Sequence, residues 1–231
     1  MTAEIHKHPK TIASRLTEDL TEAIVRGEIP AGKKLSEPDL ARRYEVSRGP
    51  LREALRRLEG RGLIRHVPHA GTRVVTLERE EILELSRVRE ALEGMAARLA
   101  AERMSDAEID ELSRLLDEHE KTVERTQGRE YFQQEGDLDF HYRIVKGSRN
   151  PKLIALLCGD LYHLVRMYRY QASKNVSRPQ KALAEHRRVV EAIAERDGEL
   201  AELLIRRHLS ASRASIADQL RGRDERGTGS V

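Results

Sequence analysis

The sequence contains no tryptophan, and only 3% of its 231 residues are aromatic. Leucine, alanine, glutamate and arginine dominate instead, and these residues favour helix throughout the chain. The one cysteine, Cys158, cannot pair within the chain, which excludes an intrachain disulfide and is typical of a reducing compartment. No apolar stretch approaches membrane-spanning length, and the N-terminus lacks the apolar core of a signal peptide. We therefore expect a cytoplasmic, mainly α-helical protein with no membrane partner.

The net charge of +3 is distributed unevenly along the chain. Up to Thr76 there are 15 Lys and Arg residues against 10 Asp and Glu, whereas the remainder has 27 against 29. A basic first part before a mildly acidic body favours a nucleic-acid-binding module joined to a domain with another task. We expect a flexible N-terminus over 1–9, a small basic domain over 10–76, a larger helical domain over 78–220 and a disordered tail over 221–231.

Residues 34–74 predict a winged helix-turn-helix. The segment LSEPDLARRY offers a short helix, and after the break EVS a second helix follows over 48–59, with apolar residues at helical spacing. Ser47 is placed to cap this second helix through its hydroxyl. LIRHV and TRVVT then alternate like two strands around a turn over 68–71, which forms the wing. An amphipathic helix over 11–26 precedes these elements.

The second of these helices carries arginines on its polar face. An α-helix fits the major groove of DNA, and an arginine fork matches the acceptors of guanine or the oxygens of a phosphate. The alternative is a three-helix subdomain whose arginines only form a solvated face, but the cap, the turn and the wing together favour DNA binding. The residues expected to contact DNA are Arg42, Arg43, Ser47, Arg48, Arg52, His69, Gly71 and Arg73.

The remainder of the chain predicts an all-helical bundle. Apolar residues recur at amphipathic spacing, and Ser105 and Glu108 form a capping-box pattern. We expect helices over 80–103, 106–126, 129–146, 151–172, 178–195 and 198–220. The fold class is therefore mainly α, with an N-terminal winged helix-turn-helix plus a C-terminal all-helical bundle of about six helices.

Three histidines and an aspartate are expected to point into this bundle. Asp137 and His141 are four residues apart on one expected helix, so their side chains project from the same face, which also carries Leu138. His186 and His208 fall on the apolar stripes of two later helices. A single such histidine is usually a hydrogen-bonded core residue, but burying several titratable groups without a shared partner is costly. A divalent cation (Zn²⁺, Ni²⁺ or Mn²⁺) would satisfy all four.

The stretch AGKKLSEPDLARRYEVSRGPLREALRRLEGRGLI and the wing resemble the GntR family of bacterial transcription regulators. Residues 78–220 resemble the FCD ligand-binding domain of its FadR subfamily. The resemblance implies DNA contact through Arg48 and Arg52. Many relatives have an arginine where this chain has Pro38, at a position associated with operator contact, and Arg42 or Arg43 is expected to replace it.

The FCD motif is an Asp four residues before a His, then a His opening the penultimate helix and a His in the last helix. It maps without substitution onto Asp137, His141, His186 and His208. The resemblance implies a bound metal whose coordination is completed by a small organic acid. Arg89 occupies a position that often faces this cavity in relatives, and Arg166 and Tyr162 are further candidates. For the arginines the alternative is an exposed or ion-paired role, and packing explains Tyr162 equally well.

With this resemblance, the chain is expected to be a homodimeric repressor that binds a palindromic double-stranded DNA operator. A small organic acid, citrate-like or from the methylcitrate cycle, would release it. One alternative is a regulator that senses the metal itself. Another is a metal-dependent hydrolase, but the sequence has no HExxH motif, and Glu185 is expected to face away from the His186 stripe. An acyl-CoA sensor fits poorly, because a polar metal site would occupy the pocket floor.

Overall fold

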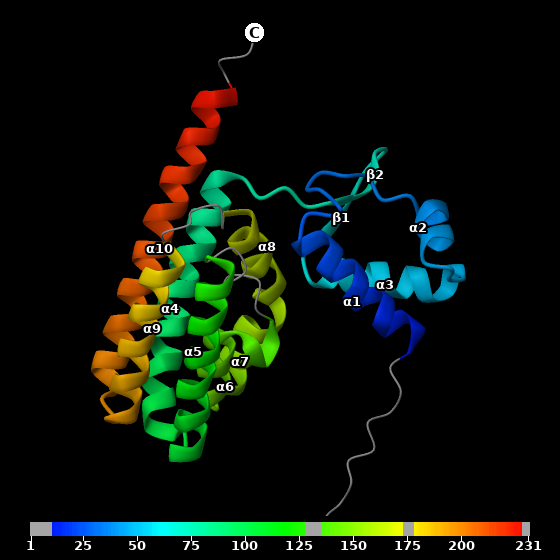
Figure 1. The fold of residues 1–231 in the computed structure, drawn as a ribbon. Helices are drawn as coiled ribbons and strands as arrows, with labels where there is room; N and C mark the ends of the chain where they lie inside the picture. The colour runs from blue at the N-terminus through cyan, green and yellow to red at the C-terminus, as the bar shows by residue number, and fades with distance from the viewer. Residues whose placement is uncertain (1–10, 128–134, 173–177, 228–231) are drawn as a thin grey trace, which may run out of the picture. The chain divides into compact units, whose positions relative to one another are not determined.

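A computed structural model of the chain describes the backbone of residues 11–127, 135–172 and 178–227. The chain divides into two compact units, Met1–Thr76 and Leu77–Val231. Figure 1 shows one unit of helices with a two-stranded ribbon and a larger unit built of helices. The mainly helical fold class and the small wing expected from the sequence are confirmed.

The N-terminal unit consists of three helices and a wing. Its elements are α1 (Ile12–Val25), α2 (Glu37–Arg43), α3 (Arg48–Gly60), β1 (Ile64–Val67) and β2 (Gly71–Val74). The apolar faces of α1 and α3 pack together through buried leucine and isoleucine side chains, among them Leu16, Leu20, Ile24, Leu51 and Leu58. β1 and β2 pair antiparallel, which produces the expected two-stranded wing.

The wing turns through two residues with left-handed backbone. His69 has a φ of 60° and Gly71 a φ of 81°. Glycine tolerates this conformation best because it lacks a Cβ atom, and a Cβ at Gly71 would also approach Cε of Lys34 to 3.3 Å. The turn leaves His69 exposed at the tip, while the buried Ile64 and Val74 fix the base of the ribbon.

The C-terminal unit is a helical bundle. Its helices are α4 (Arg79–Arg103), α5 (Asp106–Thr126), α6 (Phe140–Gly147), α7 (Pro151–Ala155), α8 (Tyr162–Ala172), α9 (Arg178–Ala194) and α10 (Gly198–Gly227). α4 packs against α6, α9 and α10, and α5 packs against α6 and α9. α4 has four fully buried alanines, whose small side chains allow close approach of its neighbours: Ala96, Ala97, Ala100 and Ala101. Among the described helices, none has the length and apolar character needed to cross a bilayer.

The helix expected over 129–146 begins later than predicted. Within the residues described from 135 onward, Gly136–Leu138 form a 3₁₀ turn (η2), and the α-helix starts only at Phe140. Asp139 has an extended backbone and is the N-cap, because its carboxylate accepts a hydrogen bond from the backbone N–H of His141 at 3.0 Å. Helical spacing in the sequence therefore extended the helix across its own cap.

This later start corrects two expectations about side-chain direction. Asp137 lies in η2 and not on the helix of His141, so the two residues do not share a helix face. Leu138, expected on the buried face with His141, is 59% exposed, whereas Ile144 is 1% exposed. The apolar face of α6 is formed by the residues that follow the cap.

Two further helix boundaries differ from those expected. The helix predicted over 151–172 is interrupted by a π-helical turn, Leu156–Asp160, between α7 and α8. The described part of the unit therefore has seven α-helices instead of about six. α10 continues to Gly227, so residues 221–227, expected to belong to a disordered tail, are helical; they include no proline, which would have ended the helix. Residues 1–9 and 228–231 lie outside the described residues.

Replacing Ile144 and Leu138 by alanine tests where the apolar face of α6 begins. Ile144→Ala should lower the free energy of unfolding of the C-terminal unit by about 2–5 kcal/mol, because it leaves a cavity in the core. Leu138→Ala should change it by less than about 0.5 kcal/mol, because the side chain is exposed. Urea denaturation followed by circular dichroism measures both. Equal losses would mean that the two residues share a buried stripe after all.

Candidate functional site

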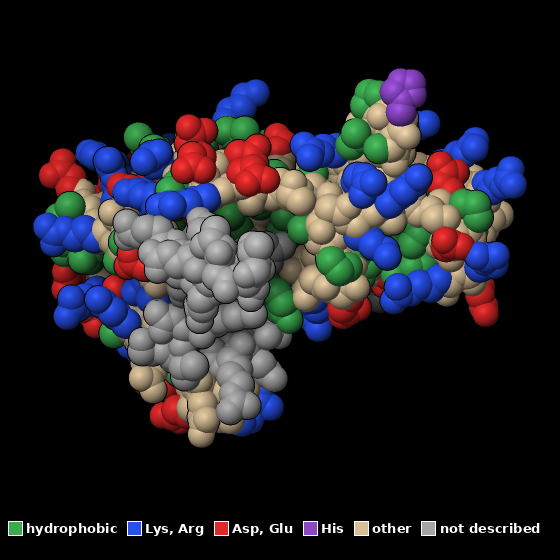
Figure 2. All heavy atoms as spheres, turned by 90° about the horizontal axis from the view of Figure 1, so that it is seen from above, with side chains coloured by type: hydrophobic (Ala, Val, Ile, Leu, Met, Phe, Trp, Pro, Cys, Tyr) green, Lys and Arg blue, Asp and Glu red, His purple; other side chains and the backbone are tan. Residues whose placement is uncertain are grey.

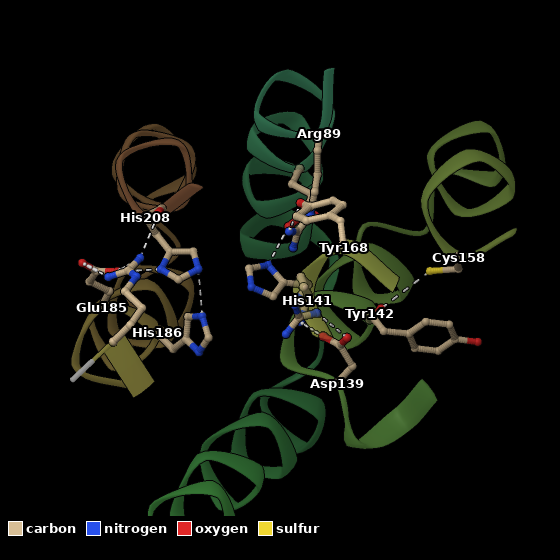
Figure 3. Close-up of polar contacts among 12 residues, drawn as sticks. Arg89, Asp139, His141, Tyr142, Cys158, Tyr168, Glu185, His186 and His208 are labelled. Atoms are coloured by element: carbon tan, nitrogen blue, oxygen red, sulfur yellow. Dashed lines mark hydrogen bonds and ion pairs between the residues drawn. The ribbon is translucent and has the colours of Figure 1, made fainter. Parts of the chain in front are cut away.

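Three imidazoles from three helices meet inside the C-terminal unit (Figure 3). His141 lies on α6, His186 on α9 and His208 on α10, and none is more than 6% exposed. One ring nitrogen from each lies within 4.8 Å of the other two. The Nε2 atoms of His186 and His208 are 3.1 Å apart, and His141 faces this pair from the opposite side. A single cation could therefore contact all three rings.

Two glutamates orient two of these rings. His141 donates a hydrogen bond from Nδ1 to Glu93, and His208 donates from Nδ1 to Glu185, each at 2.6 Å. A neutral imidazole that donates from Nδ1 keeps its Nε2 lone pair for another partner, as metal-binding histidines commonly do. Glu185 was expected to face away from the His186 stripe. It does lie beside the His186 stripe of α9, but its carboxylate reaches across to His208 on α10.

Burial keeps the three histidines neutral. It lowers the pKa of His208 to about 4, although the hydrogen bond with Glu185 acts in the opposite direction. Burial, followed by the charges that its neighbours would carry, brings the pKa of His186 well below its usual value. Burial also lowers the pKa of His141, against the opposing effect of Glu93. Neutral imidazole is the form that binds a metal, so these residues could hold a divalent ion without first losing protons.

Arg89 of α4 lies behind His141 and is only 3% exposed. Its Nε donates to Oε1 of Glu93, and its Nη1 donates to the hydroxyl of Tyr168 at 3.0 Å. Burial alone would lower the pKa of Arg89 and raise the pKa of Glu93, but their mutual attraction outweighs it and keeps both charged. Nη2 of Arg89 is buried without a hydrogen-bond partner in the described chain. Such a donor is costly, so it marks a position for an acceptor other than the described residues.

The segment that precedes α6 is contacted by two residues of α8, Arg166 and Tyr162. These are the other residues that were expected to contact an acid. The hydroxyl of Tyr162 accepts a hydrogen bond from the backbone N–H of Gly136 at 2.5 Å. Arg166 forms an ion pair with Glu135 at 3.2 Å, and its guanidinium lies 5.8 Å from the ring centroid of Tyr162. Both side chains are buried in α8. Their contact with an acid stays a prediction.

The fourth expected ligand, Asp137, has a side chain outside the described residues. The carboxylate described next to this position belongs to Asp139, which is 1% exposed and pairs with Arg169 of α8 at 2.7 Å. Burial would raise the pKa of Asp139, but the positive charge of Arg169 holds it below its usual value. Asp139 therefore starts α6 and joins it to α8.

Several charged residues around the site were not anticipated from the sequence, namely Glu93, Asp139, Arg169 and Arg178. A local signal exists for Glu93, which follows Arg89 by four residues, the spacing of an ion pair along a helix. For Arg169 and Arg178 the sequence offers no such signal. Arg169 pairs with Asp139 outside its own helix, and Arg178 contacts Glu185 further along α9 and the carbonyl of His208 on α10.

In the N-terminal unit, α3 presents arginines to the solvent. Arg48, Arg52 and Arg56 follow one another at one-turn spacing, and all three are exposed. Arg48 has no ion-pair partner among the described residues, while Nε of Arg52 is held by Glu37 of α2 at 3.2 Å. Figure 2 shows Lys and Arg side chains spread over the visible surface of this unit.

The start of α3 corrects one detail of the expected cap. Ser47 is the N-cap residue, but its hydroxyl makes no hydrogen bond to the helix. The reason is the sequence itself, because the third helical position is Pro50, which has no N–H to donate. The exposed hydroxyl is therefore left for a partner outside the chain. Arg42 and Arg43, at the end of α2, are also exposed.

The wing residues differ in how accessible they are. His69 is exposed, whereas Gly71 and Arg73 are partly buried. Arg73 is directed back onto its own unit, where its Nη1 donates to the carbonyl of Gly32 at 2.9 Å. Its contact with DNA stays a prediction.

Both units match a known family description. Residues 84–211 match the FCD domain, and residues 12–74 match the bacterial regulatory proteins of the gntR family. The first range contains all three histidines of the candidate site, and the second contains α3 and the wing.

Named relatives resemble the chain over most of its length. It is 30% identical to an uncharacterized HTH-type transcriptional regulator of Bacillus subtilis strain 168, YdhC, over 83% of this chain and 84% of that protein. It is 29% identical to the HTH-type transcriptional repressor RspR of Escherichia coli strain K12, over 94% of both proteins. The solved structure of E. coli McbR/YncC shares the fold, with a TM-score of 0.74 at 21% identity over 92% of this chain and 100% of that one.

Asp139→Asn should lower the free energy of unfolding of the C-terminal unit by about 3–5 kcal/mol. The amide still offers an oxygen to the helix cap, but it leaves the charge of Arg169 buried without a counter-ion. Glu111→Gln is the control, because Glu111 is exposed in its ion pair with Arg143 and such pairs contribute less than about 1 kcal/mol. Urea denaturation of the two variants would show similar small losses if the Asp139 pair were only peripheral.

Proposed function

The chain belongs to the GntR family of bacterial transcription regulators and carries an FCD domain, and we propose that it is a metal-containing, acid-responsive homodimeric repressor. Its hold on a palindromic operator would be released when a small organic acid binds beside the metal. The observation that carries this proposal is the group of three buried, neutral imidazoles next to an arginine with an unpartnered donor. Such an architecture fits the FadR-like subfamily.

We propose that α3 enters the major groove of the operator. The N-terminal end of a recognition helix meets base edges, and this end of α3 carries the exposed Arg48 and the unengaged hydroxyl of Ser47. Arg52 lies one turn later, with one edge of its guanidinium fixed by Glu37. This fixed edge leaves the terminal nitrogens of Arg52 for guanine or phosphate. The exposed His69 would bring the wing to a neighbouring stretch of backbone.

A homodimer would supply two such helices for the two halves of a palindrome. Exposed apolar side chains on the C-terminal unit support it. Val88 and Met95, seven residues apart on one face of α4, are 49% and 45% exposed. α10, which packs against α4, exposes Leu200 and Leu203. Apolar surface of this kind marks a site of association.

The metal would be held by His141, His186 and His208, with Asp137 as the proposed fourth ligand. Imidazole nitrogens with a carboxylate suit Zn²⁺, Ni²⁺ or Mn²⁺. When bound, the ion supplies a Lewis-acidic position to which a carboxylate can coordinate. The protein's own contribution is orientation, because the carboxylates behind two of the rings keep their Nε2 atoms directed at the shared space.

The acid would be anchored a second time by Arg89. Its unpartnered Nη2 is the donor that a ligand carboxylate would satisfy, and a charge-assisted hydrogen bond in a buried site is a strong one. Arg166 and Tyr162 lie on α8, which also carries the Tyr168 that touches Arg89. A di- or tricarboxylate, citrate-like or from the methylcitrate cycle, has one carboxylate for the metal and another for the arginine.

A regulator that responds to the metal ion alone is the second candidate. The triad of His141, His186 and His208 favours it, because the three imidazoles are already gathered without any acid. A hydrolase is disfavoured by a different observation. Glu93 and Glu185, two carboxylates that contact these histidines, are both committed to Nδ1 of a ligand ring, so neither is placed to act as a general base.

Arg48→Ala should cost about 1–3 kcal/mol of specific DNA binding, because it removes a fork from the base-reading end of α3. Arg56→Ala, two turns further along the same face, should cost less. Fluorescence anisotropy with a duplex selected by the parent protein from a random pool measures both, and circular dichroism checks the fold. Parent-like affinity of Arg48→Ala would contradict the proposed docking of α3.

His141→Ala should lower the stoichiometric metal content of the purified protein and raise the acid concentration needed for operator release. His163→Ala is the control, because His163 lies on α8 outside the triad. Elemental analysis gives the metal content, and adding metal alone to chelated protein separates the two candidates. A change in operator affinity with metal and no acid would favour direct metal sensing. A parent protein that neither contains nor takes up metal would contradict both.

A further inference from the structure

One carboxylate, that of Glu93, contacts both the proposed metal subsite, through His141, and the proposed acid subsite, through Arg89. Oε2 of Glu93 accepts the hydrogen bond from Nδ1 of His141 at 2.6 Å, and Oε1 accepts from Nε of Arg89. All three side chains are at most 7% exposed, so water does not compete for these contacts. A change in either partner of Glu93 is therefore felt by the other.

The guanidinium of Arg89 is only partly used inside the protein. Glu93 holds its Nε, the hydroxyl of Tyr168 accepts from its Nη1, and its Nη2 has no hydrogen-bond partner in the described chain. A carboxylate prefers to bind an arginine through two nitrogens at once. Because Nε and Nη2 form one edge of the fork, Glu93 occupies half of the edge that an incoming carboxylate would use.

We propose that Glu93 is a positioning residue that couples metal binding to acid binding, by sharing its carboxylate between His141 and Arg89. This inference rests on the proposed function, since it names how the metal and acid subsites of that same site communicate. An imidazole that coordinates a cation through Nε2 donates more strongly from Nδ1. Glu93 is then drawn toward His141, its hold on Arg89 weakens, and Arg89 becomes available to an anion.

The coupling is reciprocal, as any coupling between two binding equilibria must be. Arg89 and His141 compete for Glu93. An anion on Arg89 removes this competition, so Glu93 holds His141 more strongly and the ring becomes a better metal ligand. The structure contains its own control for this idea. Glu185 also accepts from His208 at 2.6 Å. The arginine that pairs with Glu185 is Arg178, and its other hydrogen bond goes to the backbone carbonyl of His208. Glu185 therefore serves one metal ligand, with no link to Arg89 among the described contacts.

The test compares Glu93→Gln with Glu185→Gln in full-length protein freed of metal by a chelator. Calorimetry gives the Zn²⁺ affinity and the succinate affinity, the latter with and without Zn²⁺. Succinate is chosen because it has two carboxylates and chelates zinc weakly in solution. Both variants should lose about 10–100-fold in Zn²⁺ affinity, as expected when the carboxylate behind a ligand histidine is removed.

Succinate distinguishes the two variants. Zinc-free Glu93→Gln should bind succinate several-fold more tightly than the parent, because Arg89 is released, whereas Glu185→Gln should bind it as the parent does. Zn²⁺ should raise the succinate affinity of the parent and of Glu185→Gln by at least about 5-fold. In Glu93→Gln that factor should fall to the value in Arg89→Gln, where only direct contact with the metal remains.

A third variant keeps the comparison available if Glu93→Gln does not fold. The double variant Arg89→Gln with Glu93→Gln leaves no unpaired charge, and its coupling factor should equal that of Arg89→Gln alone. The coupling role is overturned if the coupling factor of the double variant falls below that of Arg89→Gln, or if Glu93→Gln and Glu185→Gln bind succinate identically. Either outcome leaves the proposed function standing. A parent protein that binds neither Zn²⁺ nor succinate overturns the proposed function together with this inference.

Discussion

Three imidazoles buried against one another cannot all carry a charge, and the polar contacts around them satisfy this constraint. With the Nε2 atoms of His186 and His208 only 3.1 Å apart, protonation of both rings would place two like charges in a medium of low dielectric constant. Burial keeps the rings neutral, and the carboxylates of Glu93 and Glu185 fix two of them as Nδ1–H tautomers. The Nε2 lone pairs of His141 and His208 are thereby left for a further partner, and the Nε2 of His186 lies within hydrogen-bond distance of that of His208.

The charges around this set cancel in pairs. Arg89 faces Glu93, Arg169 faces Asp139, and Arg178 faces Glu185. A divalent cation would add two positive charges, of which the proposed ligand Asp137 would offset one, and the cost of burying the remainder falls when an anion enters with it. The same reasoning accounts for a site that combines neutral imidazole ligands with the unpartnered Nη2 donor of Arg89. In the proposed function, metal and acid therefore belong together on electrostatic grounds.

The sequence predicted those parts of the structure that depend on local periodicity. Helical spacing placed His186 and His208 on buried faces, and alternation placed the wing, because both patterns are set within a few residues. The predictions of helix start and of the helix cap failed where a single residue determines the local backbone against the pattern around it. Asp139 starts a helix inside a periodic stretch, and Pro50 removes the N–H that Ser47 would have capped. Pairs such as Asp139 with Arg169, thirty residues apart, depend on packing between helices and carry no local pattern.

The candidate site combines a fixed part with a part that depends on neighbouring helices. The three rings are carried by α6, α9 and α10, whereas the backbone of Asp137 lies in the η2 turn. This turn is held from outside, by the hydroxyl of Tyr162 on α8 and by His119 of α5, whose Nε2 lies 2.9 Å from the carbonyl of Leu138. Because α8 also carries the Tyr168 that contacts Arg89, its packing bears on the proposed fourth ligand and on the proposed acid anchor at once.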